Sequence, residues 1–431
     1  MHSDLSVPRA HGLTFASRLE WLRAHRWSVP VLLLLLTIVS FALRIIWLDK
    51  PNTLIFDEAY YVNAARIILH IPVMPGHPYA GATSGLDPNT EHPPLGKLFI
   101  ALSMHIFGDN GVGWRLPSVI LGTASIPLLY GVVRSLGGTT WLALLATYFY
   151  AFDNLVFVHS RIGTLDIFLM PFLFLGVYCY VKGRPLLASF AFVLATVCKI
   201  GGLYGVAAIV VFEALRLLRT RAESGRWAWA TLRPLLFMVV VYVVYLLWML
   251  GVLDTFWSSY KNPLDHLHHI LSYGLSLTRK GGPQGQESYP WQWLLNDVQM
   301  NYLTTDVNVM VNGTVTATRH AIYVRGAMNP IIIGAATMGL AYSAWRAWRF
   351  RDPLSFWVVA WVATNYLVYY PVSMIEDRVS YIFYFLPTIP AVAVGLAQFL
   401  YAPEVPRVVR WTFIGAVLLG FYGYFPFRQV P

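Results

Sequence analysis

The chain has 431 residues, of which 57% are hydrophobic and 12% charged, and its formal net charge is +10. Soluble chains average about 25% charged residues, so this composition excludes an ordinary soluble enzyme. Apolar segments of roughly 17–22 residues recur along the whole chain and predict an all-α, polytopic membrane protein. Basic residues of membrane proteins collect in cytoplasmic loops, so the net charge does not indicate nucleic acid as a partner.

The apolar pattern predicts eleven spans. Residues 1–26 are polar and basic, and no A-x-A cleavage site follows the first apolar run, so we expect an uncleaved first span rather than a signal peptide. The two cysteines, Cys179 and Cys198, fall inside spans and are expected to pack as small hydrophobes. The spans lie at about 29–48, 115–133, 139–158, 165–181, 185–200, 201–215, 232–253, 328–345, 353–371, 380–400 and 411–425.

Residues 95–107 form an apolar run of a different kind. Its 13 residues, rising 1.5 Å each in a helix, fall short of the roughly 30 Å of hydrocarbon in a bilayer. Proline is tolerated in a first helical turn, so Pro93 and Pro94 suit the start of such a helix. We therefore expect an interfacial helix whose apolar stripe is Leu95, Leu98, Phe99, Leu102 and Ile106.

The distribution of basic residues predicts the orientation. With the N-terminus in the cytoplasm, 17 of the 31 Lys and Arg residues fall in short inside segments, as the positive-inside rule requires. Counting 95–107 as a span would expose "RLLRTRAESGR" (216–226) outside, against that rule. The 17 residues are Arg9, Arg18, Arg23, Arg26, Arg134, Lys182, Arg184, Arg216, Arg219, Arg221, Arg226, Arg233, Arg346, Arg349, Arg351, Arg407 and Arg410.

This topology divides the chain into four parts. Residues 1–28 form a cytoplasmic N-terminal segment, and residues 29–253 form a catalytic transmembrane module that includes an outside loop at 49–114. A second outside loop follows at 254–327, and residues 328–431 supply the C-terminal helices. We expect the second loop to be mostly helical, with a hinge at "KGGPQGQ" (280–286), and to close over a site as a lid.

Charged residues gather at the outer ends of many different spans. Such charges are costly near a membrane and indicate function by default, so this pattern predicts one polar cavity open to the outside. Structural alternatives exist: Asp57 could cap a helix, Glu58 could complement a helix N-terminus, and Lys97 or Arg115 could extend to the interface. The set is Asp57, Glu58, Glu91, Lys97, Arg115, Asp153, Arg161, Asp166, Lys199, Glu376, Asp377 and Arg378.

Two further motifs lie in the second outside loop. The stretch "DHLHHI" (265–270) resembles a metal-binding run, but its histidines lack a set of partners at defined spacing. We expect these histidines to face solvent or substrate, and we assign no residue to a metal. The run Asn312-Gly313-Thr314 fits a glycosylation sequon on the outside face.

A carboxylate and several cations at an outer membrane face suit one kind of chemistry. A reaction there needs a donor that is already activated and that the membrane delivers, and a sugar on a polyprenyl phosphate meets both conditions. Asp57 could take a proton from an acceptor hydroxyl. Arginine or lysine could hold the phosphate as its negative charge develops.

Seven stretches along the chain resemble the protein O-mannosyltransferases (glycosyltransferase family 39), and they occur in that family's order. The family belongs to the GT-C class of polytopic enzymes, which use dolichyl- or polyprenyl-phosphate sugars and invert the anomeric centre. The stretches are "FDEAYY" (56–61), "EHPPLGK" (91–97), "WRLPSVILGTASIPLLY" (114–130), "FDNLVFVHSRIGTLD" (152–166), "SYPWQWLL" (288–295), "MNPIII" (328–333) and "RVSYIFYFLPTIPA" (378–391).

The resemblance implies roles for particular residues. Asp57 and Glu58 are the expected catalytic pair, with Asp57 as the acid/base and Glu58 beside it in donor or acceptor binding. The expected donor phosphate contacts are Arg115, Lys97 and Arg378. The lipid-linked sugar phosphate is the only donor predicted, and dependence on a divalent metal stays open. The expected supporting residues are Glu91, His92, Asp153, Asn154, Arg161 and Asp166.

Differences from the family bear on the acceptor. Eukaryotic members carry a β-trefoil domain in the second long loop, for which residues 254–327 have no room, so we expect a bacterial enzyme of the cytoplasmic membrane. "HPPL" (92–95) replaces the Lys-Pro-Pro-Leu of a relative that modifies lipid A, which favours mannose transfer to Ser or Thr of exported proteins. A glycolipid or polysaccharide acceptor stays open, as does the separate alternative of a transporter or lipid flippase.

Overall fold

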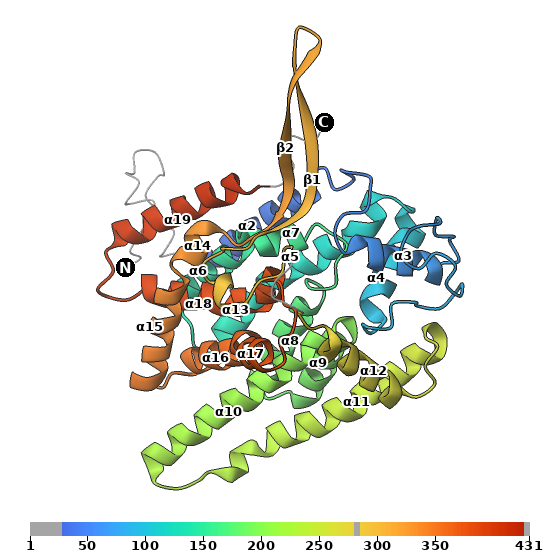
Figure 1. The fold of residues 1–431 in the computed structure, drawn as a ribbon. Coiled ribbons are helices and arrows are strands. Elements are labelled where there is room, and N and C mark those ends of the chain that lie inside the picture. Colours follow the sequence, from blue (N-terminus) through green and yellow to red (C-terminus); the bar gives the residue numbers. More distant parts are fainter. Residues whose placement is uncertain (1–27, 280–284, 426–431) are drawn as a thin grey trace, which may run out of the picture.

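The computed structural model describes residues 28–279 and 285–425, so the predicted cytoplasmic segment 1–28 lies almost wholly outside the described residues. The described chain is a body of packed helices from which one two-stranded hairpin projects (Figure 1). Six of its helical stretches are long and apolar enough to cross a membrane. This confirms a polytopic membrane protein. These stretches are Ser28–Ile45, Gly111–Ser135, Ile200–Ser224, Trp229–Trp257, Pro353–Ile375 and Ile382–Leu400.

The N-terminal half alternates long helices with short ones. Every predicted span in this half coincides with helical structure, although the count of eleven membrane crossings stays a prediction. The elements are α2 (Ser28–Ile45), α3 (Glu58–Ile68), α4 (Leu95–Phe107), α5 (Gly111–Ser135), α6 (Thr140–Ala151), α7 (Asn154–His159), α8 (Leu169–Val181), α9 (Pro185–Cys198), η1 (Ile200–Gly202) and α10 (Leu203–Ser224).

The C-terminal half contains the hairpin and the more interrupted helices. Its elements are η2 (Trp229–Leu232), α11 (Arg233–Trp257), α12 (Pro263–Ser276), α13 (Pro290–Trp293), β1 (Met300–Val311), β2 (Thr314–Gly326), α14 (Pro330–Gly334), α15 (Ala336–Arg349), α16 (Pro353–Val362), η3 (Ala363–Leu367), α17 (Tyr369–Ile375), η4 (Ile382–Thr388), α18 (Ile389–Leu400) and α19 (Arg407–Gly423).

Local signals fix several helix ends near the first outside loop. The predicted helix at 95–107 is α4, which begins after Pro93 and Pro94 and ends at Gly108, whose φ of 89° suits glycine. The side chain of Asn110 then accepts hydrogen bonds from the amides of Val112 and Gly113 and so caps α5. The first loop thus ends in two well-terminated helices.

The predicted span at 139–158 is broken in the structure. Helix α6 ends at Ala151, and Asp153 caps the short helix α7 by accepting from the amides of Leu155 and Val156. The second oxygen of Asp153 accepts from the amide of Asn329 at 3.0 Å, which ties the break to the start of α14. The predicted span at 139–158 is thus built from two helices, because a buried aspartate ends the first one and caps the second.

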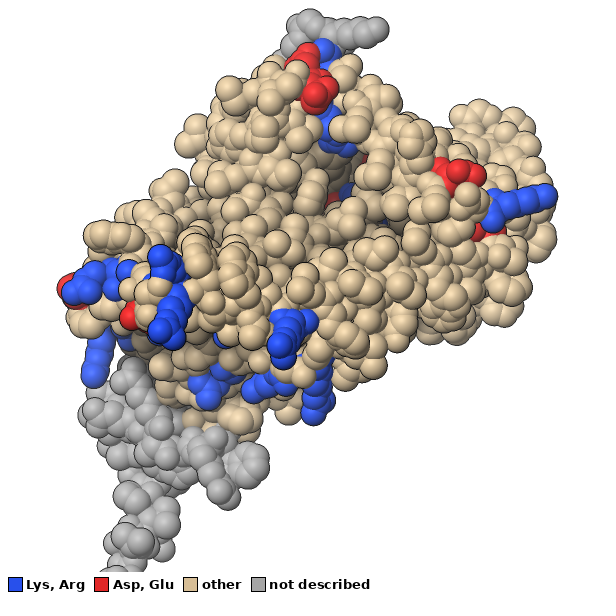
Figure 2. Space-filling view, turned by 90° about the horizontal axis from the view of Figure 1, so that it is seen from below, with Lys and Arg blue, Asp and Glu red and all other residues tan. Residues whose placement is uncertain are grey.

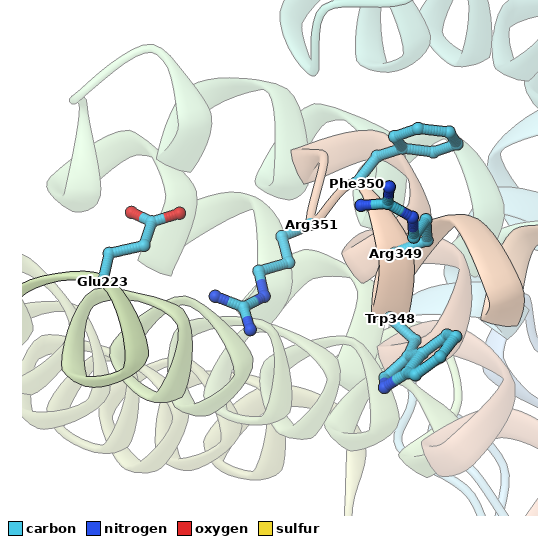
Figure 3. A pocket seen from close by; sticks show the side chains of 5 residues that line it. All are labelled: Glu223, Trp348, Arg349, Phe350 and Arg351. Carbon is cyan, nitrogen blue, oxygen red and sulfur yellow. The ribbon is translucent and has the colours of Figure 1, made fainter.

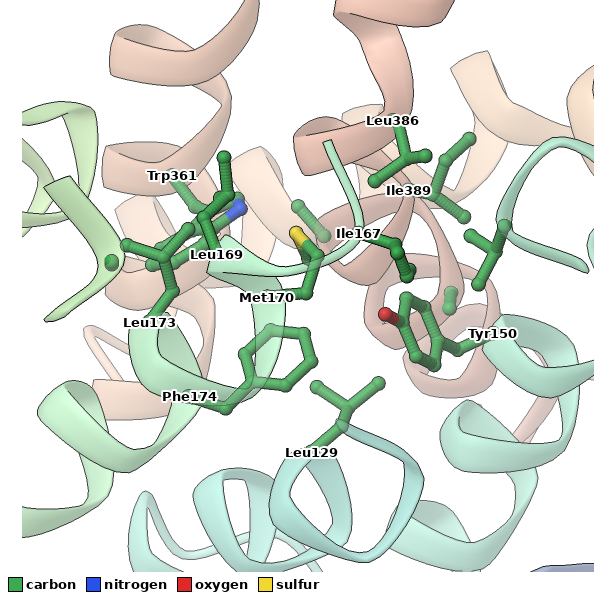
Figure 4. Packing of buried hydrophobic residues seen from close by; sticks show 14 of the residues in the cluster. Leu129, Tyr150, Ile167, Leu169, Met170, Leu173, Phe174, Trp361, Leu386 and Ile389 are labelled. Carbon is green, nitrogen blue, oxygen red and sulfur yellow. The ribbon is translucent and has the colours of Figure 1, made fainter. Parts of the chain in front are cut away.

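The core lies where α5, α6, α8 and the C-terminal helices meet (Figure 4). Leu129, Tyr150 and Phe174 are fully buried and come from three of these helices. Leu386 and Ile389, at the junction of η4 and α18, pack into the same cluster. Burying such side chains stabilises the arrangement by roughly 1.5–3 kcal/mol each, and it fixes the loops that end at the site.

The second outside loop differs from the prediction of a mostly helical segment. It contains α12 and α13, but residues 300–326 form the antiparallel hairpin of β1 and β2, with Val311 paired to Thr314. Asn312 and Gly313 link the strands, both with positive φ (49° and 78°), as a two-residue hairpin turn requires. Asn-Gly between alternating side chains is a strong hairpin signal, and the sequon interpretation of Asn312 obscured it.

Basic side chains gather toward one end of the molecule (Figure 2). Many of them belong to the end of α10, the start of α11 and the end of α15. The acidic pair at Asp57 and Glu58 belongs instead to the first outside loop, beside α3 and α4. This separation agrees with the predicted inside segments.

Candidate active site

Asp57 lies immediately before α3 and is half-buried. Its side chain makes no capping hydrogen bond, so helix capping does not explain why an aspartate occupies this position. Burial raises the pKa of Asp57 to about 7; the charge of Lys199 opposes this shift and that of Asp166 adds to it. Within the described residues, the carboxylate has no hydrogen-bond or ion-pair partner. It is therefore a weakly acidic group that is free to accept a proton near neutral pH.

The backbone that presents Asp57 is strained. Phe56 has a φ of 51°, a left-handed conformation that is costly for a bulky residue. Its ring stacks on Tyr302 at 4.2 Å between centroids and meets Phe383 edge-on at 5.5 Å. Tyr302 also shares a 2.8 Å hydrogen bond with Nε2 of His159. Because a Cβ at Gly326 would lie 2.4 Å from the Tyr302 ring, only glycine leaves room for this ring.

Glu58 differs from Asp57, because its side chain is fully buried and both of its carboxylate oxygens accept hydrogen bonds. Its two oxygens accept from Nε and one Nη of Arg115 at 2.8 and 2.9 Å. They also accept from the amides of Gly163 and Ile55. Arg115 gives its remaining hydrogen bonds to carbonyls in the segment 48–53. In this arrangement neither residue offers a free polar atom to a substrate, so their predicted roles in catalysis and phosphate binding lack support from the geometry.

Lys97 is also enclosed. Its ammonium lies 2.6 Å from a carboxylate oxygen of Asp87 and donates to the carbonyls of Asn89 and His92. Both members of the ion pair are buried. Lys97 therefore anchors the loop 87–92 to α4, and its predicted phosphate contact has no free donor here. Asp87, which the sequence analysis did not single out, is the partner that makes this burial possible.

Lys199 and Arg378 both lie near the ring of Tyr384, and Lys199 is also close enough to Asp57 for its charge to act on that carboxylate. Lys199 pairs with Asp166 at 2.6 Å and lies 5.8 Å from the centre of the Tyr384 ring. Arg378 lies 5.7 Å from the same ring centre. Arg378 donates to the carbonyls of Gly274 and Val379, which fix its direction. Lys199 was noted in the sequence only as one of many outer charges, and Tyr384 was missed.

Two buried polar atoms near these cations lack hydrogen-bond partners among the described residues: Nδ1 of His92 and one carboxylate oxygen of Asp166. Burial and the charges of Lys199, Lys97 and Arg378 lower the pKa of His92 well below its ordinary value, so the imidazole is neutral. Native proteins rarely leave buried polar atoms unpaired, and such atoms next to a cation pair are candidates for ligand contact. Glu91 lies one residue away and accepts from the side chain of Asn89.

The other predicted supporting residues hold helices together away from Asp57. Asn154 donates to the carbonyl of Phe421 in α19, and Asp153 caps α7 as described above. Arg161 donates to the carbonyls of Leu43 and Ile46, at the end of α2. A cation there also complements the carboxyl end of that helix. The structure therefore gives Asp153, Asn154 and Arg161 structural contacts.

The second outside loop reaches the site from the other side. The backbone of Thr278 forms a bridge with that of Arg378, and the amide of Arg279 donates to the carbonyl of Asp377 at 2.7 Å. The buried guanidinium of Arg279 lies over Tyr289 and retains two nitrogens without partners within the described residues. The loop is therefore joined to the segment that carries Arg378, while its role as a lid stays a prediction.

The "DHLHHI" run does not behave uniformly. His266 is buried, 2.7 Å from a carboxylate oxygen of Asp254, and stacks on Tyr260. The expectation that these histidines face solvent or substrate was wrong for His266, which fastens α12 to α11, whereas His268 is exposed. Across the described ranges, no group of three or more His, Cys, Asp or Glu side chains is placed to hold a metal ion.

The hollows of the surface lie in several places. The face in Figure 2 is hollowed near its middle, where acidic and basic atoms are visible. An apolar groove of about 480 Å³ runs between α2, α6 and α19, and a polar pocket of about 450 Å³ lies at the far end of α10. Neither of these two pockets includes a residue near Asp57. The candidate active site is defined by Asp57, Asp166, Lys199 and Arg378.

Comparisons with known proteins find similar sequences in one family of enzymes. The dolichyl-phosphate-mannose-protein mannosyltransferase family matches residues 91–248. A polyprenol-phosphate-mannose–protein mannosyltransferase of Mycolicibacterium smegmatis is 29% identical over 162 residues, which are 38% of this chain and 30% of that protein. The protein of the same name from Corynebacterium glutamicum is 25% identical over 413 residues, covering 80% of this chain and 77% of that protein.

Solved structures share the fold at low sequence identity. The protein O-mannosyltransferase Pmt1-Pmt2 complex of S. cerevisiae bound to the sugar donor has a TM-score of 0.70 at 14% identity, and the match covers 95% of this chain and 91% of that chain. ArnT from Cupriavidus metallidurans bound to undecaprenyl phosphate has a TM-score of 0.52 at 18% identity, with 90% and 62% covered. These matches confirm the resemblance predicted from the motifs: the chain has the GT-C fold and is similar to the dolichyl- and polyprenol-phosphate-mannose–protein mannosyltransferases.

Proposed function

We propose that this chain is an inverting glycosyltransferase that moves mannose from a polyprenyl-phosphate carrier to a Ser or Thr hydroxyl of an exported protein. The observation that carries the proposal is the unpartnered carboxylate of Asp57 near Lys199, which shares the Tyr384 ring with a second cation, Arg378. The similar proteins support the choice of donor and acceptor, since their names specify polyprenol-phosphate mannose and protein.

The residues around Asp57 suit the steps of this reaction. The acceptor hydroxyl loses its proton to Asp57, and its oxygen attacks the anomeric carbon of the sugar from the face opposite the phosphate. The bond between that carbon and the phosphate oxygen breaks, which inverts the centre and releases the lipid phosphate. The charges of Lys199 and Arg378 stabilise the phosphate as it leaves. We assign the phosphate contact to this pair in place of Arg115 and Lys97, whose donors are already occupied.

The orientation is part of the proposal. With the N-terminus in the cytoplasm, the first outside loop and Asp57 face the outer side of a bacterial cytoplasmic membrane. The gathering of basic residues around the ends of α10 and α15 supports this direction. A lipid-linked donor reaches such a site from within the bilayer, and an exported polypeptide reaches it from outside.

A transfer assay tests the proposal. Membranes that contain the protein are incubated with radiolabelled polyprenyl-phosphate mannose or glucose, and the products are separated into protein, lipid and polysaccharide fractions. We expect label from mannose in the protein fraction, and far less of it with an Asp57→Asn variant. Label found only in lipid or polysaccharide would show that the acceptor is not a protein. Label transferred only from the glucose donor would show that the sugar is not mannose. No transfer from either donor would contradict the proposal.

A further inference from the structure

A polar pocket lies at the end of α10 that is remote from Asp57. It has a volume of about 450 Å³ and is lined by Glu223 of α10 and by Trp348, Arg349, Phe350 and Arg351 (Figure 3). Helix α10 has 22 residues and so extends about 33 Å at 1.5 Å per residue. Lys199 precedes the start of α10, so the pocket and the proposed catalytic site lie a membrane thickness apart along this helix.

The pocket carries an excess of positive charge. Glu223 is matched by Arg219 one turn earlier, at 2.9 Å. Arg219 also donates to the carbonyl of Arg351, which joins the end of α10 to the end of α15. Arg349 and Arg351 have no carboxylate partner among the described residues. The pocket therefore offers two uncompensated guanidinium groups, the side chain that best matches phosphate oxygens in proteins.

The backbone of Arg351 is unusual for an arginine. Its φ is 54°, and its amide donates to the carbonyl of Arg346 just beyond the end of α15. Glycine is the usual residue at this left-handed position after a helix, because it has no Cβ to strain. A site that accepts this strain and directs the side chain into a pocket is a candidate for ligand binding.

The rim of the pocket is aromatic. The exposed fractions are 76% for Trp348 and 52% for Phe350. The predicted span at 328–345 ends just before these residues, and large aromatic side chains at the end of a membrane span are typical of the layer where lipid headgroups lie. A ligand of this pocket would thus meet guanidinium groups and lipid-facing rings together.

We propose that this pocket binds the phosphate headgroup of an anionic phospholipid on the membrane face opposite the catalytic site. The phosphate would lie between Arg349 and Arg351, and its acyl chains would lie beside Trp348 and Phe350. Basic residues at cytoplasmic helix ends also follow from membrane topology, and they complement a helix carboxyl end. Those roles require neither a pocket nor an arginine in the left-handed region, and basic pockets between membrane helices are known to bind anionic headgroups.

The test is a binding titration by native mass spectrometry on the full-length protein in neutral detergent. The ligands are phosphatidylglycerol and phosphatidylcholine with the same acyl chains, with inorganic phosphate as a separate arm. The variants are Arg351→Gly and Arg349→Gln. Arg407→Ala is the matched control, since it removes an exposed charge of the same predicted face outside the pocket. Thermal unfolding of each protein is recorded in parallel.

We expect one phosphatidylglycerol to bind in preference to phosphatidylcholine. Loss of a charge-assisted contact should weaken this binding by roughly tenfold or more in each pocket variant, and by much less in Arg407→Ala. The unfolding temperature of Arg351→Gly should be at least that of the wild type, since glycine relieves the left-handed strain. Equal binding of the two lipids, unchanged binding by Arg351→Gly, or binding of inorganic phosphate without any preference for phosphatidylglycerol would overturn the proposal.

Discussion

Asp57 and Glu58 are adjacent in the chain but lie in two regions of opposite character. Around Asp57 the structure leaves polar atoms without partners: its own carboxylate, Nδ1 of His92 and an oxygen of Asp166. Around Glu58 every polar atom is used, in a bidentate pair with Arg115 and two backbone hydrogen bonds. Open polar groups bind and react, whereas closed networks fix geometry. We infer that Asp57 accepts the proton in the reaction, and that the hydrogen-bonded network of Glu58 fixes the backbone beside it.

The largest expected effect of this difference is at Asp57 itself. Asparagine has nearly the same shape but cannot take the acceptor's proton, so Asp57→Asn should lower transfer by about 10²–10⁴-fold, the usual contribution of a general base. Because the carboxylate has no partner to lose, thermal unfolding should change little. Initial rates with polyprenyl-phosphate mannose check the first point, and scanning fluorimetry in detergent checks the second. Turnover within a few-fold of the wild type would remove Asp57 from the chemistry.

The opposite behaviour is expected at Glu58. Glu58→Gln removes the charge that compensates the buried Arg115, and breaking such a pair costs about 3–5 kcal/mol of stability. Thermal unfolding should show a clear fall in temperature, and the rate per folded molecule should fall less than in Asp57→Asn. Glu223→Gln is the matched control, because it breaks the exposed pair with Arg219 and should shift unfolding little. Similar unfolding temperatures for both variants would show that the Glu58 network is not structural.

A smaller effect is expected at the phosphate. Lys199→Met should lower kcat/KM for the lipid donor by roughly 10–150-fold, the range expected for one charge-assisted contact. The double variant Lys199→Met with Asp166→Asn avoids an unpaired buried carboxylate and separates donor binding from folding. Lys182→Met, in the turn after α8, is the control that should leave donor use unchanged. If Lys182→Met and Lys199→Met had equal effects, the phosphate would have to be held elsewhere.

The smallest expected substitution effect is at Tyr302. Tyr302→Phe keeps the ring stacked on Phe56 and loses only the hydrogen bond with His159. One neutral hydrogen bond contributes about 1 kcal/mol, so transfer should fall only severalfold. Tyr302→Ala also removes the ring that supports the strained backbone before Asp57, and should cost more. Measured rates in the reverse order would mean that the hydroxyl, and not the stacking, matters.

Much of the fold could be predicted from the sequence because hydrophobic length and charge asymmetry are local signals. Six of the predicted spans coincide with described helices that are long and apolar enough to cross a membrane, and α4 has the predicted bounds. The break between α6 and α7 was not predicted. It depends on Asp153, whose carboxylate receives its third hydrogen bond from Asn329, far along the chain. The hairpin could have been predicted from Asn312-Gly313 between alternating residues.

The candidate site was harder to predict, because the sequence shows which charges exist but not which of them are already paired. Lys97 and Arg115 have the residue type expected of phosphate ligands, yet Asp87 and Glu58 occupy them. Lys199 and Tyr384 lie far apart along the chain and meet only in the folded protein. The acidic pair at 57–58 and Arg378 were therefore visible in the sequence, while the position of Lys199 beside Asp57 was not.

The most direct test of the central claim, that Asp57 is the proton acceptor, is the pH dependence of single-turnover transfer with bound polyprenyl-phosphate mannose. The base must be ionised to act, and burial raises the pKa of Asp57 to about 7. The rate should therefore rise about tenfold per pH unit below that value and level off above it, with no such limb in the residual activity of Asp57→Asn. A wild-type rate that is constant from pH 5 to pH 8, far above the ordinary carboxylate pKa of about 4, would contradict the claim.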